Sequence, residues 1–513
     1  MKKQATASTI STKSLWAATK REPELPRLRT SSEADVVVVG AGIAGLTTAY
    51  LLSQAGKHVI VLDDGPIGGG QTELTSAHLS SAIDDRFTEI ERLHGKEGAR
   101  LTAESHSAAI DRIEAVVAAE RIDCDFERVN GYLCNPPGDS ADTLDEEYEA
   151  ALRTGVLDVA IVERAPWPHF DTGRAICFGR QAQFHPLKYL NGLAQAIIER
   201  RSEIHCGTHV KSVQGGDAAK VETSDGKSVS AKHIVVATNT PINDLVAIHT
   251  KQAPYLTYVI GARMPRDAIE RALYWDTADP YHFVRVQRAE DGPGDVVLVG
   301  GEDHKTGQAD DGPERFLRLE VWARERFPLM EEVTFRWAGQ VMETLDGLAF
   351  IGRNPLDEKN VYIATGDSGM GLTHGTIAGM LLTDLILGRE NPWEKLYEPT
   401  RKPAGALRDF ASENLNVAAQ YATWLTPGEV HSADEIPPGQ GAILRRGLSK
   451  VAAYRDESGK LTMLSAVCPH LKCIVTWNDT ERTWDCPCHG SRFSAEGQVL
   501  VGPANVDLRA AED

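Results

Sequence analysis

Two short pieces near the C-terminal end hold half of the eight cysteines in the chain. The first, CPHLKC, places Cys468 and His470 in a C-x-H pattern, and the second, CPCHGS, places Cys486 and His489 in a C-x-x-H pattern. Fifteen residues, 471–485, separate the two pairs. Thiolate sulfur and imidazole nitrogen are ligands both for zinc and for iron–sulfur clusters. The spacing therefore predicts a metal centre with two cysteine and two histidine ligands.

Zinc is one occupant of such a site, but this separation of C-x-H and C-x-x-H is the Rieske spacing. The two pieces resemble the cluster loops of Rieske proteins in respiratory and photosynthetic cytochrome bc complexes. GPA, at 502–504, resembles the proline loop that covers their cluster. The resemblance implies a [2Fe-2S] cluster whose first iron is held by Cys468 and Cys486 and whose second iron is held by His470 and His489.

Cys473 and Cys488 occupy the positions at which those relatives join the two cluster loops by a disulfide. A disulfide is unusual in a reducing cytoplasm. One that closes a short loop beside a cluster can be shielded from thiol exchange, so we expect it here, with a pair of packed free thiols as the alternative.

Hydrogen bonds to the cluster sulfurs raise its reduction potential, because they stabilise the more negative reduced state. Ser491 offers a hydroxyl where the high-potential relatives have one, whereas Phe493 stands where many of them carry tyrosine. The sequence therefore predicts an intermediate potential, below that of the quinol-oxidising type.

A glycine-rich turn near the other end of the chain predicts a dinucleotide site. VVVVGAGIAG places Gly40, Gly42 and Gly45 in the G-x-G-x-x-G spacing, after an apolar strand and before a helix that ends near Gly56. Gly40 permits the tight turn, Gly42 lets the backbone approach a pyrophosphate, and Gly45 lets helix and strand pack closely. The next strand delivers Asp63, 18 residues after Gly45, where a carboxylate can bind ribose hydroxyls.

Two further segments favour FAD over NAD. GGGQTELTSAHLS (68–80) and ATGDSGMGLTHGTIAG (364–379) resemble flavin-contact segments of the D-amino-acid oxidase-like superfamily, which includes glycine oxidase, sarcosine oxidase and dimethylglycine dehydrogenase. The resemblance covers roughly residues 35–390. It implies that the first segment passes the isoalloxazine ring, that the second sets a helix N-terminus beside the pyrimidine edge, and that a strand backbone contacts adenine. The residues implied to contact FAD are Thr72, Thr75, Ser76, His78, Val210, Gly366, Gly369, Met370, Gly371, Leu372 and Thr373.

Several relatives attach their flavin covalently. The cysteine that some of them use is absent from GDSGMGLTHG, and His78 lies near the position of a histidyl link in others. We expect His78 to be a polar residue near the flavin, with the covalent link as the alternative.

A flavin accepts two electrons, whereas a [2Fe-2S] cluster carries one. The chain resembles bacterial fusions of a D-amino-acid oxidase-like protein with a Rieske domain. This combination predicts a dehydrogenase that takes a hydride from a C–N bond of a small amine or amino acid. Single electrons would then pass through the cluster to an external acceptor.

Two other functions use the same cofactors. The first is a reductase that feeds the cluster from NAD(P)H, which would normally need a second G-x-G-x-x-G, and the sequence holds none. The second is a non-catalytic electron carrier or redox sensor, which a closed cavity at the flavin face would favour.

Candidate substrate residues follow from the β-rich part of the chain. Arg285, in YHFVRV, could bind a carboxylate through two hydrogen bonds. Tyr255, Tyr258 and Trp337 could line an aromatic pocket, and His374 could be polar lining or a proton relay. Ordinary packing is the alternative for each, and no catalytic residue is assigned.

The elements that position these residues divide the chain of 513 residues into several domains. Residues 1–34 read as an irregular leader. For residues 35–400 the sequence pattern predicts an α/β FAD-binding Rossmann-like domain that includes a β-rich substrate subdomain. Buried strands are expected at 233–239, 295–301 and 360–369. A helical connector at 401–425 and a small all-β Rieske domain at 426–513 complete the prediction.

The formal net charge of −19 argues against nucleic acid or an anionic membrane as a partner. A run of about 18 apolar residues is absent, so we expect no membrane span. The first 23 residues lack both an apolar signal core and a twin-arginine pair, which predicts a cytoplasmic location.

Overall fold

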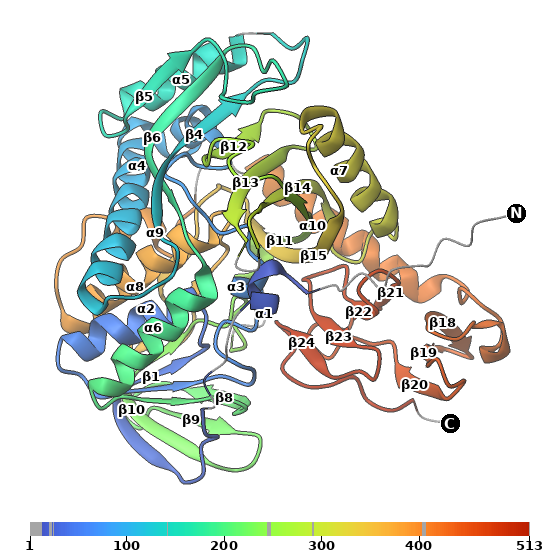
Figure 1. Cartoon of the computed structure of the whole chain (residues 1–513). Coiled ribbons are helices and arrows are strands. Elements are labelled where there is room, and N and C mark those ends of the chain that lie inside the picture. Colours follow the sequence, from blue (N-terminus) through green and yellow to red (C-terminus); the bar gives the residue numbers. More distant parts are fainter. Residues whose placement is uncertain are drawn as a thin grey trace, which may run out of the picture.

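The computed structural model describes residues 13–19, 23, 25–140, 142–243, 248–289, 292–402 and 407–511. For residues 407–412 it describes the backbone only. Two large sheets with their helices form most of the chain, and two small sheets form its C-terminal end (Figure 1). The expected fold class is confirmed: an α/β nucleotide-binding part, a β-rich part and a small all-β part follow one another along the sequence.

The first large sheet has eight strands and contains the glycine-rich turn. Its main path runs β16-β17-β10-β1-β2-β7, and β1 pairs in parallel with both β2 and β10. The four valines of DVVVV are buried, which is why this run forms a central strand. The strands are β1 (Ser32–Val39), β2 (Val59–Leu62), β7 (Glu203–His205), β8 (Val210–Gln214), β9 (Lys220–Thr223), β10 (Ser228–Val236), β16 (Phe350–Arg353) and β17 (Val361–Thr365).

The second large sheet has nine strands and faces the nucleotide-binding part. Its path runs β15-β11-β14-β13-β12-β4-β6-β3, with β5 beside β6. The strands are β3 (His78–Leu79), β4 (Glu127–Cys134), β5 (Val159–Val162), β6 (Ala175–Gln183), β11 (Gln252–Met264), β12 (Leu273–Asp276), β13 (His282–Arg288), β14 (Asp295–Lys305) and β15 (Val333–Thr344).

Helices cover both large sheets, and α2 packs against α8 next to the first one. The helices of this part are α1 (Leu15–Thr19), α2 (Ile43–Gln54), α3 (Gln71–Leu74), α4 (Arg86–Glu120), α5 (Asp142–Arg153), α6 (Pro186–Glu199), η1 (His249–Lys251), α7 (Gly312–Arg326), α8 (Gly371–Leu387) and α9 (Glu394–Tyr397). No helix in the described ranges is long and apolar enough to cross a bilayer.

The expected irregular leader, 1–34, lies partly outside the described residues, and its described part contains a short buried helix. Ser14 receives a hydrogen bond from the Ala17 N–H on its hydroxyl, and α1 follows. Trp16 in α1 is fully buried against the core of the large part. The correction has a physical reason, since an apolar Leu-Trp pair gains more by packing than by staying in water.

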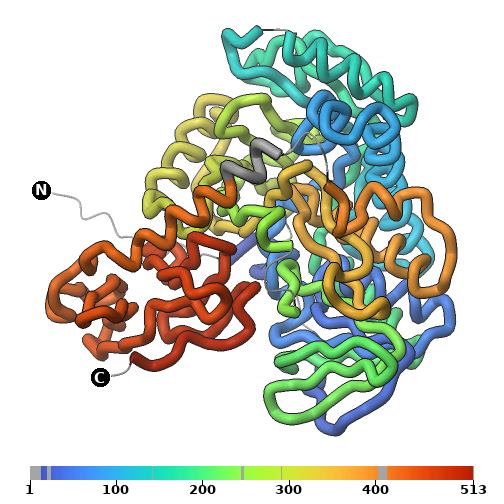
Figure 2. Tube along the Cα trace, turned by 180° about the vertical axis from the view of Figure 1, so that it is seen from behind, coloured from blue at the N-terminus to red at the C-terminus, as the bar shows by residue number. Residues whose placement is uncertain are grey.

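The C-terminal part begins after α10 (Leu407–Gln420), which leads from the large part to the small sheets (Figure 2). One small sheet has the order β18-β19-β20 and the other β21-β22-β23-β24. The elements are η3 (Tyr421–Leu425), η4 (Ala433–Glu435), β18 (Gln440–Arg446), β19 (Ser449–Arg455), β20 (Leu461–Ser465), β21 (Thr476–Asn478), β22 (Thr483–Asp485), β23 (Arg492–Ser494) and β24 (Val499–Val501).

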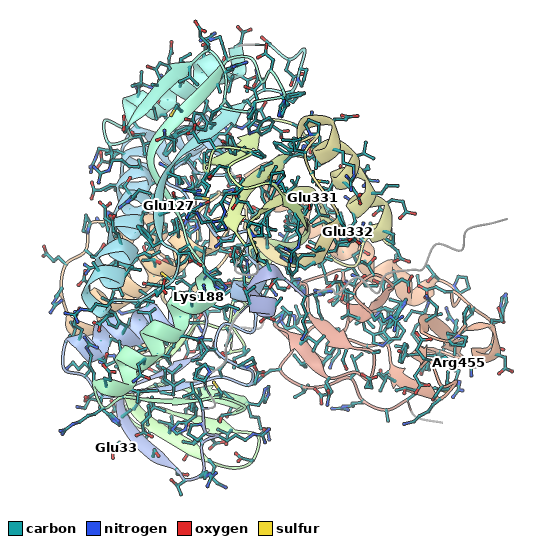
Figure 3. The ribbon with its side chains drawn as sticks, viewed as in Figure 1. Glu33, Glu127, Lys188, Glu331, Glu332 and Arg455 are labelled. Atoms are coloured by element: carbon teal, nitrogen blue, oxygen red, sulfur yellow. A yellow bond between two sulfur atoms is a disulfide. The ribbon has the colours of Figure 1, made fainter. Side chains whose placement is uncertain are left out.

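Acidic side chains are spread over the outer surface of both parts. Glu33 is exposed at one end of the large part, and the neighbouring Glu331 and Glu332 are exposed far from it (Figure 3). The net negative charge thus comes partly from this surface. A second group of acidic residues lines the internal cavity described below.

Candidate active site and metal centre

A cavity of about 710 Å³ lies where the glycine-rich turn meets the second large sheet. Its walls come from the β1–α2 turn, from residues 69–84, from the start of α8, and from β11, β12, β13 and β15. Residues 498–507 of the C-terminal part close one side. This size is ordinary for a ligand pocket, which spans roughly 300–1,000 Å³.

The glycine-rich turn fits a dinucleotide closely. Gly40 has a φ of +109°, and a Cβ there would lie 2.4 Å from the Ala237 carbonyl oxygen. A Cβ at Gly45 would lie 1.9 Å from the Gly40 oxygen, so helix and strand leave no room for a side chain. At Gly42 a Cβ would meet only the Thr72 hydroxyl, at 3.2 Å, and the space beyond belongs to the cavity. Gly42 therefore leaves room for a phosphate beside the start of α2.

Asp63 lies at the end of β2 on the wall of the cavity. Its two carboxylate oxygens accept hydrogen bonds from the N–H groups of Ala41 and Gly65, at 2.6 and 2.7 Å. Burial raises the pKa of Asp63 to about 6, and those two N–H groups oppose the shift. The carboxylate thus braces the glycine-rich turn, with remaining acceptor capacity toward the cavity.

Most residues implied to contact FAD line this cavity, and three do not. Gly45 and Gly366 are packed against the chain itself, since a Cβ at Gly366 would lie 2.4 Å from the Thr344 methyl group. The Thr373 hydroxyl contacts His106 Nδ1, at 2.9 Å. The others that line the cavity are Gly40, Gly42, Asp63, Thr72, Thr75, Ser76, His78, Val210, Gly369, Met370, Gly371 and Leu372.

Arg285 is not available as a carboxylate clamp, which corrects its candidate role. Its guanidinium is fully buried and donates to the backbone oxygens of Ala77 and Phe184, at 2.7 and 3.2 Å. It lies 5.0 Å from the centre of the Trp16 ring, and Trp16 Nε1 donates to the Thr75 oxygen at 2.7 Å. Arg285 and Trp16 therefore fix the position of the Thr75–His78 segment by hydrogen bonds to its backbone oxygens.

The three aromatic substrate candidates are also packing residues. Trp337 is fully buried and donates from Nε1 to the Leu74 oxygen, at 2.9 Å. The Tyr258 hydroxyl contacts His304, at 3.0 Å, and the Tyr255 ring lies 5.8 Å from the Lys305 ammonium. The cavity wall uses other aromatic residues of the same sheet: Trp275 on β12, Phe283 on β13 and Tyr281 just before β13.

His374 is a buried polar residue in the first turn of α8, and it forms part of the cavity lining. Its Nδ1 contacts the Asp367 oxygen at 2.8 Å, and its Nε2 contacts His106 Nε2 at 3.3 Å. Burial lowers the pKa of His374 to about 4 and that of His78 to about 3, so both rings are neutral.

The candidate metal centre forms from two turns that face each other. The Cys468 N–H donates to the Cys473 oxygen, and the Cys486 N–H to the Ser491 oxygen, both at 2.8 Å. The buried Cys468 and Cys486 thiols lie next to each other, which lowers the pKa of Cys468. The His470 and His489 rings lie 5.1 Å apart between centroids. Two thiols on one side and two imidazoles on the other match the donor set of a Rieske cluster.

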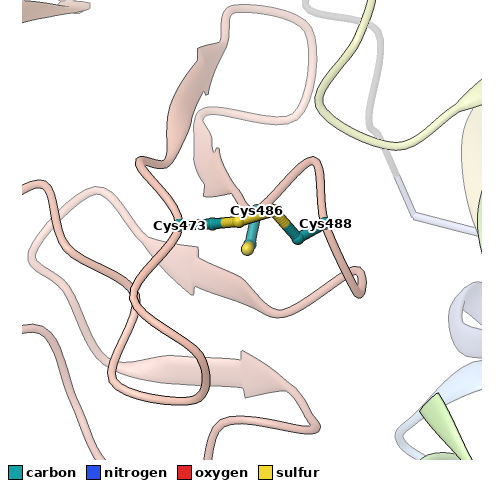
Figure 4. Close-up of side chains that lie close together, drawn as sticks. All are labelled: Cys473, Cys486 and Cys488. Atoms are coloured by element: carbon teal, nitrogen blue, oxygen red, sulfur yellow. A yellow bond between two sulfur atoms is a disulfide. The ribbon is translucent and has the colours of Figure 1, made fainter. Parts of the chain in front are cut away.

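A disulfide joins Cys473 to Cys488 and ties the two turns together (Figure 4). The Cys486 sulfur lies within 4.8 Å of both disulfide sulfurs. The pairing implied by the resemblance is therefore present, on the flank of the metal centre.

Ser491 is fully buried, and its hydroxyl lies within hydrogen-bonding reach of the Cys468 thiol. Its oxygen accepts from the Ala504 N–H at 2.9 Å, which leaves its own proton to be donated elsewhere. The pKa of Cys468 is lowered mainly by the Cys486 thiol and further by this hydroxyl.

Replacing Ser491 by alanine is expected to lower the reduction potential of the cluster. One hydrogen bond to a charged sulfur is lost, and a shift on the order of 50 mV follows for one electron. A redox titration followed by EPR measures this shift, starting from a wild-type value below the top of the roughly −150 to +300 mV range. An unchanged potential would show that Ser491 donates no bond to the sulfurs.

The two parts of the chain meet between the cavity and the metal centre. Gln340 lines the cavity and donates from Nε2 to the oxygen of Gly490, at 2.9 Å. His249, in η1 of the large part, is buried with its ring 4.8 Å from that of His470 and 6.1 Å from that of His489. Asn505 donates to the Val210 and Lys211 oxygens, both at 3.0 Å.

Sequence reasoning missed the residues of this contact. Gln340 and His249 carry no motif, and only the docking of the two parts brings them and residues 498–507 to the site. GPA at 502–504 was a partial signal, because its resemblance to a cluster-covering loop placed it near the metal but not at the cavity.

Comparisons with known proteins agree with both halves of the site. The model of the family described as FAD dependent oxidoreductase matches residues 35–385, and that of the Rieske [2Fe-2S] domain matches 426–512. A Bacillus subtilis (strain 168) protein, "Putative Rieske 2Fe-2S iron-sulfur protein YhfW", is 30% identical over 502 residues and covers 96% of each chain.

Two further comparisons cover a smaller share of the chain. Gamma-glutamylputrescine oxidoreductase of Escherichia coli (strain K12) is 28% identical over 380 residues, which is 70% of this chain and 85% of the relative. The crystal structure of glycine oxidase from Geobacillus kaustophilus superposes with a TM-score of 0.59 at 16% identity, over 72% of this chain and 99% of that one. This structural likeness shows the fold of the large part.

Proposed function

Because the chain belongs to the family of FAD dependent oxidoreductases and carries a C-terminal Rieske [2Fe-2S] domain, we propose that it dehydrogenates a C–N bond of a small amine or amino acid. Two electrons and one proton leave the substrate carbon as a hydride, the nitrogen loses a proton, and an imine forms. The electrons then leave one at a time through the cluster to an external acceptor.

The cofactors divide this chemistry between two regions. When bound, FAD supplies a two-electron acceptor and the [2Fe-2S] cluster a one-electron carrier. We assign FAD to residues 35–400, with the pyrophosphate at Gly42 and the ring beside Thr75–His78 and Gly369–Leu372. We assign the cluster to residues 426–513, with Cys468, His470, Cys486 and His489 as ligands, and the connection to residues 401–425.

The observation that carries the proposal is the contact between cavity and metal centre. Gln340 reaches from the cavity wall to the backbone of Gly490, next to the proposed ligand His489. His249 packs on both proposed histidine ligands from the large part. The buried His489 ring and the partly buried His470 ring therefore face the flavin-binding part, and this orientation supports electron transfer within one chain.

The cavity also supports an enzyme over a carrier. It extends from the glycine-rich turn to Trp275 and Phe283 on the second large sheet. The part beside these aromatic residues lies beyond the proposed nucleotide site and can hold a small substrate. A reductase fed by NAD(P)H gains no comparable support, since the sequence holds one G-x-G-x-x-G.

An anaerobic titration of the purified protein tests the proposal. A panel of amines and amino acids is added while flavin absorbance and the EPR signal of the reduced cluster are followed together. We expect one class of compound to bleach the flavin and to raise the cluster signal in the same titration. If dithionite reduces both centres but no compound does, the proposed dehydrogenation is wrong.

A further inference from the structure

The charged side chains that line the cavity are mostly acidic. Among the described residues that line it there is no lysine and no arginine. His78 and His374 are neutral, for the reasons given above. The acids on the wall are Asp63, Asp64, Asp84, Asp367 and Asp507. His209 also lines the cavity and its pKa is raised, but it is paired with Asp64 beside the nucleotide-binding strands. An amino acid substrate would therefore bring its carboxylate to the second large sheet, where no lysine, arginine or charged histidine among the described lining residues receives it.

Three of the five acids already have partners outside the substrate region. Asp63 accepts two backbone N–H groups, as described above. Asp64 lies 3.3 Å from His209, whose pKa is raised by this carboxylate. Asp507 accepts from the Val499 N–H at 2.9 Å. The remaining pair is Asp84 and Asp367.

Asp84 and Asp367 stand together at the first turn of α8. A Cβ at Gly369 would lie 2.2 Å from an Asp84 oxygen, and one at Gly371 would lie 2.5 Å from an Asp367 oxygen. Asp367 accepts from the Met342 N–H, at 3.4 Å. For Asp84 the described residues supply no hydrogen bond, and its side chain is exposed to the cavity.

More carboxyl groups stand behind Asp84. Asp84 faces the cavity but is surrounded by protein, and this desolvation, with repulsion from Asp303, raises its pKa to about 7. Burial likewise raises the pKa of Asp303 to about 7, and that of Glu343 further. Arg86 is the cation that opposes these shifts at Asp84, and it does not line the cavity. The region is therefore short of positive charge.

A second feature of the same wall points to a ligand. Thr257 is only 7% exposed and lines the cavity on β11. Its hydroxyl lies close enough to Asp303 to lower that carboxyl's pKa, but it forms no well-aligned hydrogen bond within the described part of the chain. A buried hydroxyl of this kind needs a partner, and the cavity is where one can enter.

The aromatic rings around these groups suit an organic cation. Trp275, Tyr281 and Phe283 line the cavity beside Thr257, and ring faces attract ammonium groups. A metal ion is a poorer match, because among the described residues no three of these carboxylates bring their oxygens within 4.8 Å of one another.

We propose that the substrate is a cationic amine without a carboxylate, held by Asp84 and the Thr257 hydroxyl among the aromatic rings, and that a second ammonium group strengthens its binding. This inference rests on the proposed dehydrogenation and narrows its substrate class. Asp84 is a binding residue in this assignment, and the raised pKa values of Asp303 and Glu343 behind it limit the repulsion when the cavity is empty.

Three compounds of matched length test the inference in the anaerobic flavin titration. They are 1,4-diaminobutane, n-butylamine and 4-aminobutanoate, which carries a carboxylate in place of the second amine. Flavin reduction is expected to be most efficient with the diamine, less so with butylamine, and at least about tenfold weaker with 4-aminobutanoate than with butylamine. Preference for 4-aminobutanoate, or for glycine and proline, would overturn the inference and leave the dehydrogenase intact. Reduction by none of them would overturn both.

Binding without turnover gives a second readout. tert-Butylamine has no hydrogen on the carbon next to nitrogen, and 2,2-dimethylpropanoate is an anion of similar shape. Calorimetry on the oxidised holoprotein is expected to show binding of the amine and none of the anion. Asp84→Asn should weaken amine binding about tenfold, whereas Asp217→Asn, at an exposed position, should leave it unchanged. Equal binding by wild type and Asp84→Asn would remove Asp84 from the assignment.

Discussion

Replacing Cys486 by serine is expected to abolish the EPR signal of the reduced [2Fe-2S] cluster while FAD stays bound. Cys486 is one of two buried thiols of the facing turns, and under the proposed ligand assignment its loss removes half of the thiolate ligands of one iron. The flavin should still be bleached by substrate, but reduction of a one-electron acceptor should fall by a factor on the order of 100, which corresponds to about 2.7 kcal/mol in the barrier.

The control for this change is Cys177→Ser, which removes a thiol on β6, far along the sequence from either cluster loop. It should keep both iron content and signal. A full cluster in Cys486→Ser would contradict the ligand assignment, and loss of FAD together with the cluster would show that the two parts of the chain fold only as one unit.

Replacing Gly42 by valine is expected to produce a folded protein that keeps its cluster but lacks FAD. A Cβ at this position meets only the Thr72 hydroxyl, at 3.2 Å, so the chain accommodates it, while the branched side chain occupies the space of the pyrophosphate. We expect FAD affinity to fall by a factor on the order of 100, about 2.7 kcal/mol. Flavin released by heat and quantified against iron measures the loss.

Two variants frame this result. Gly42→Ala adds a single methyl group and should keep more FAD than Gly42→Val. Gly45→Val places a Cβ 1.9 Å from the Gly40 oxygen, so it should reduce the yield of folded protein instead of FAD content alone. If Gly42→Val binds FAD as the wild type does, the pyrophosphate does not lie at this turn.

The parts of the site that depend on local spacing could be predicted from the sequence. Gly40, Gly42 and Gly45 must stand in one turn, and each cysteine–histidine pair must share one loop, so neighbours along the chain decide their geometry. The resemblance to known families added the facing segments at 68–80 and 364–379, most of whose named residues line the cavity.

Other parts depend on contacts that no local pattern records. Arg285 was a reasonable carboxylate ligand on a strand, but the backbone oxygens of Ala77 and Phe184 and the ring of Trp16 take up its guanidinium. The place of Asp84 beside Gly369 and the position of His249 on His470 arise from tertiary packing. Such pairings are set by the meeting of distant segments, so one sequence alone does not reveal them.

The most direct test of the account is the rate of cluster reduction after substrate has reduced the flavin. Stopped-flow absorbance and freeze-quench EPR follow the two centres after anaerobic mixing with the best amine. If electrons cross the contact at Gln340 and His249, cluster reduction follows flavin reduction with a rate constant that does not change with protein concentration. A rate that rises in proportion to protein concentration, or a cluster that stays oxidised beside a reduced flavin, would contradict transfer within one chain.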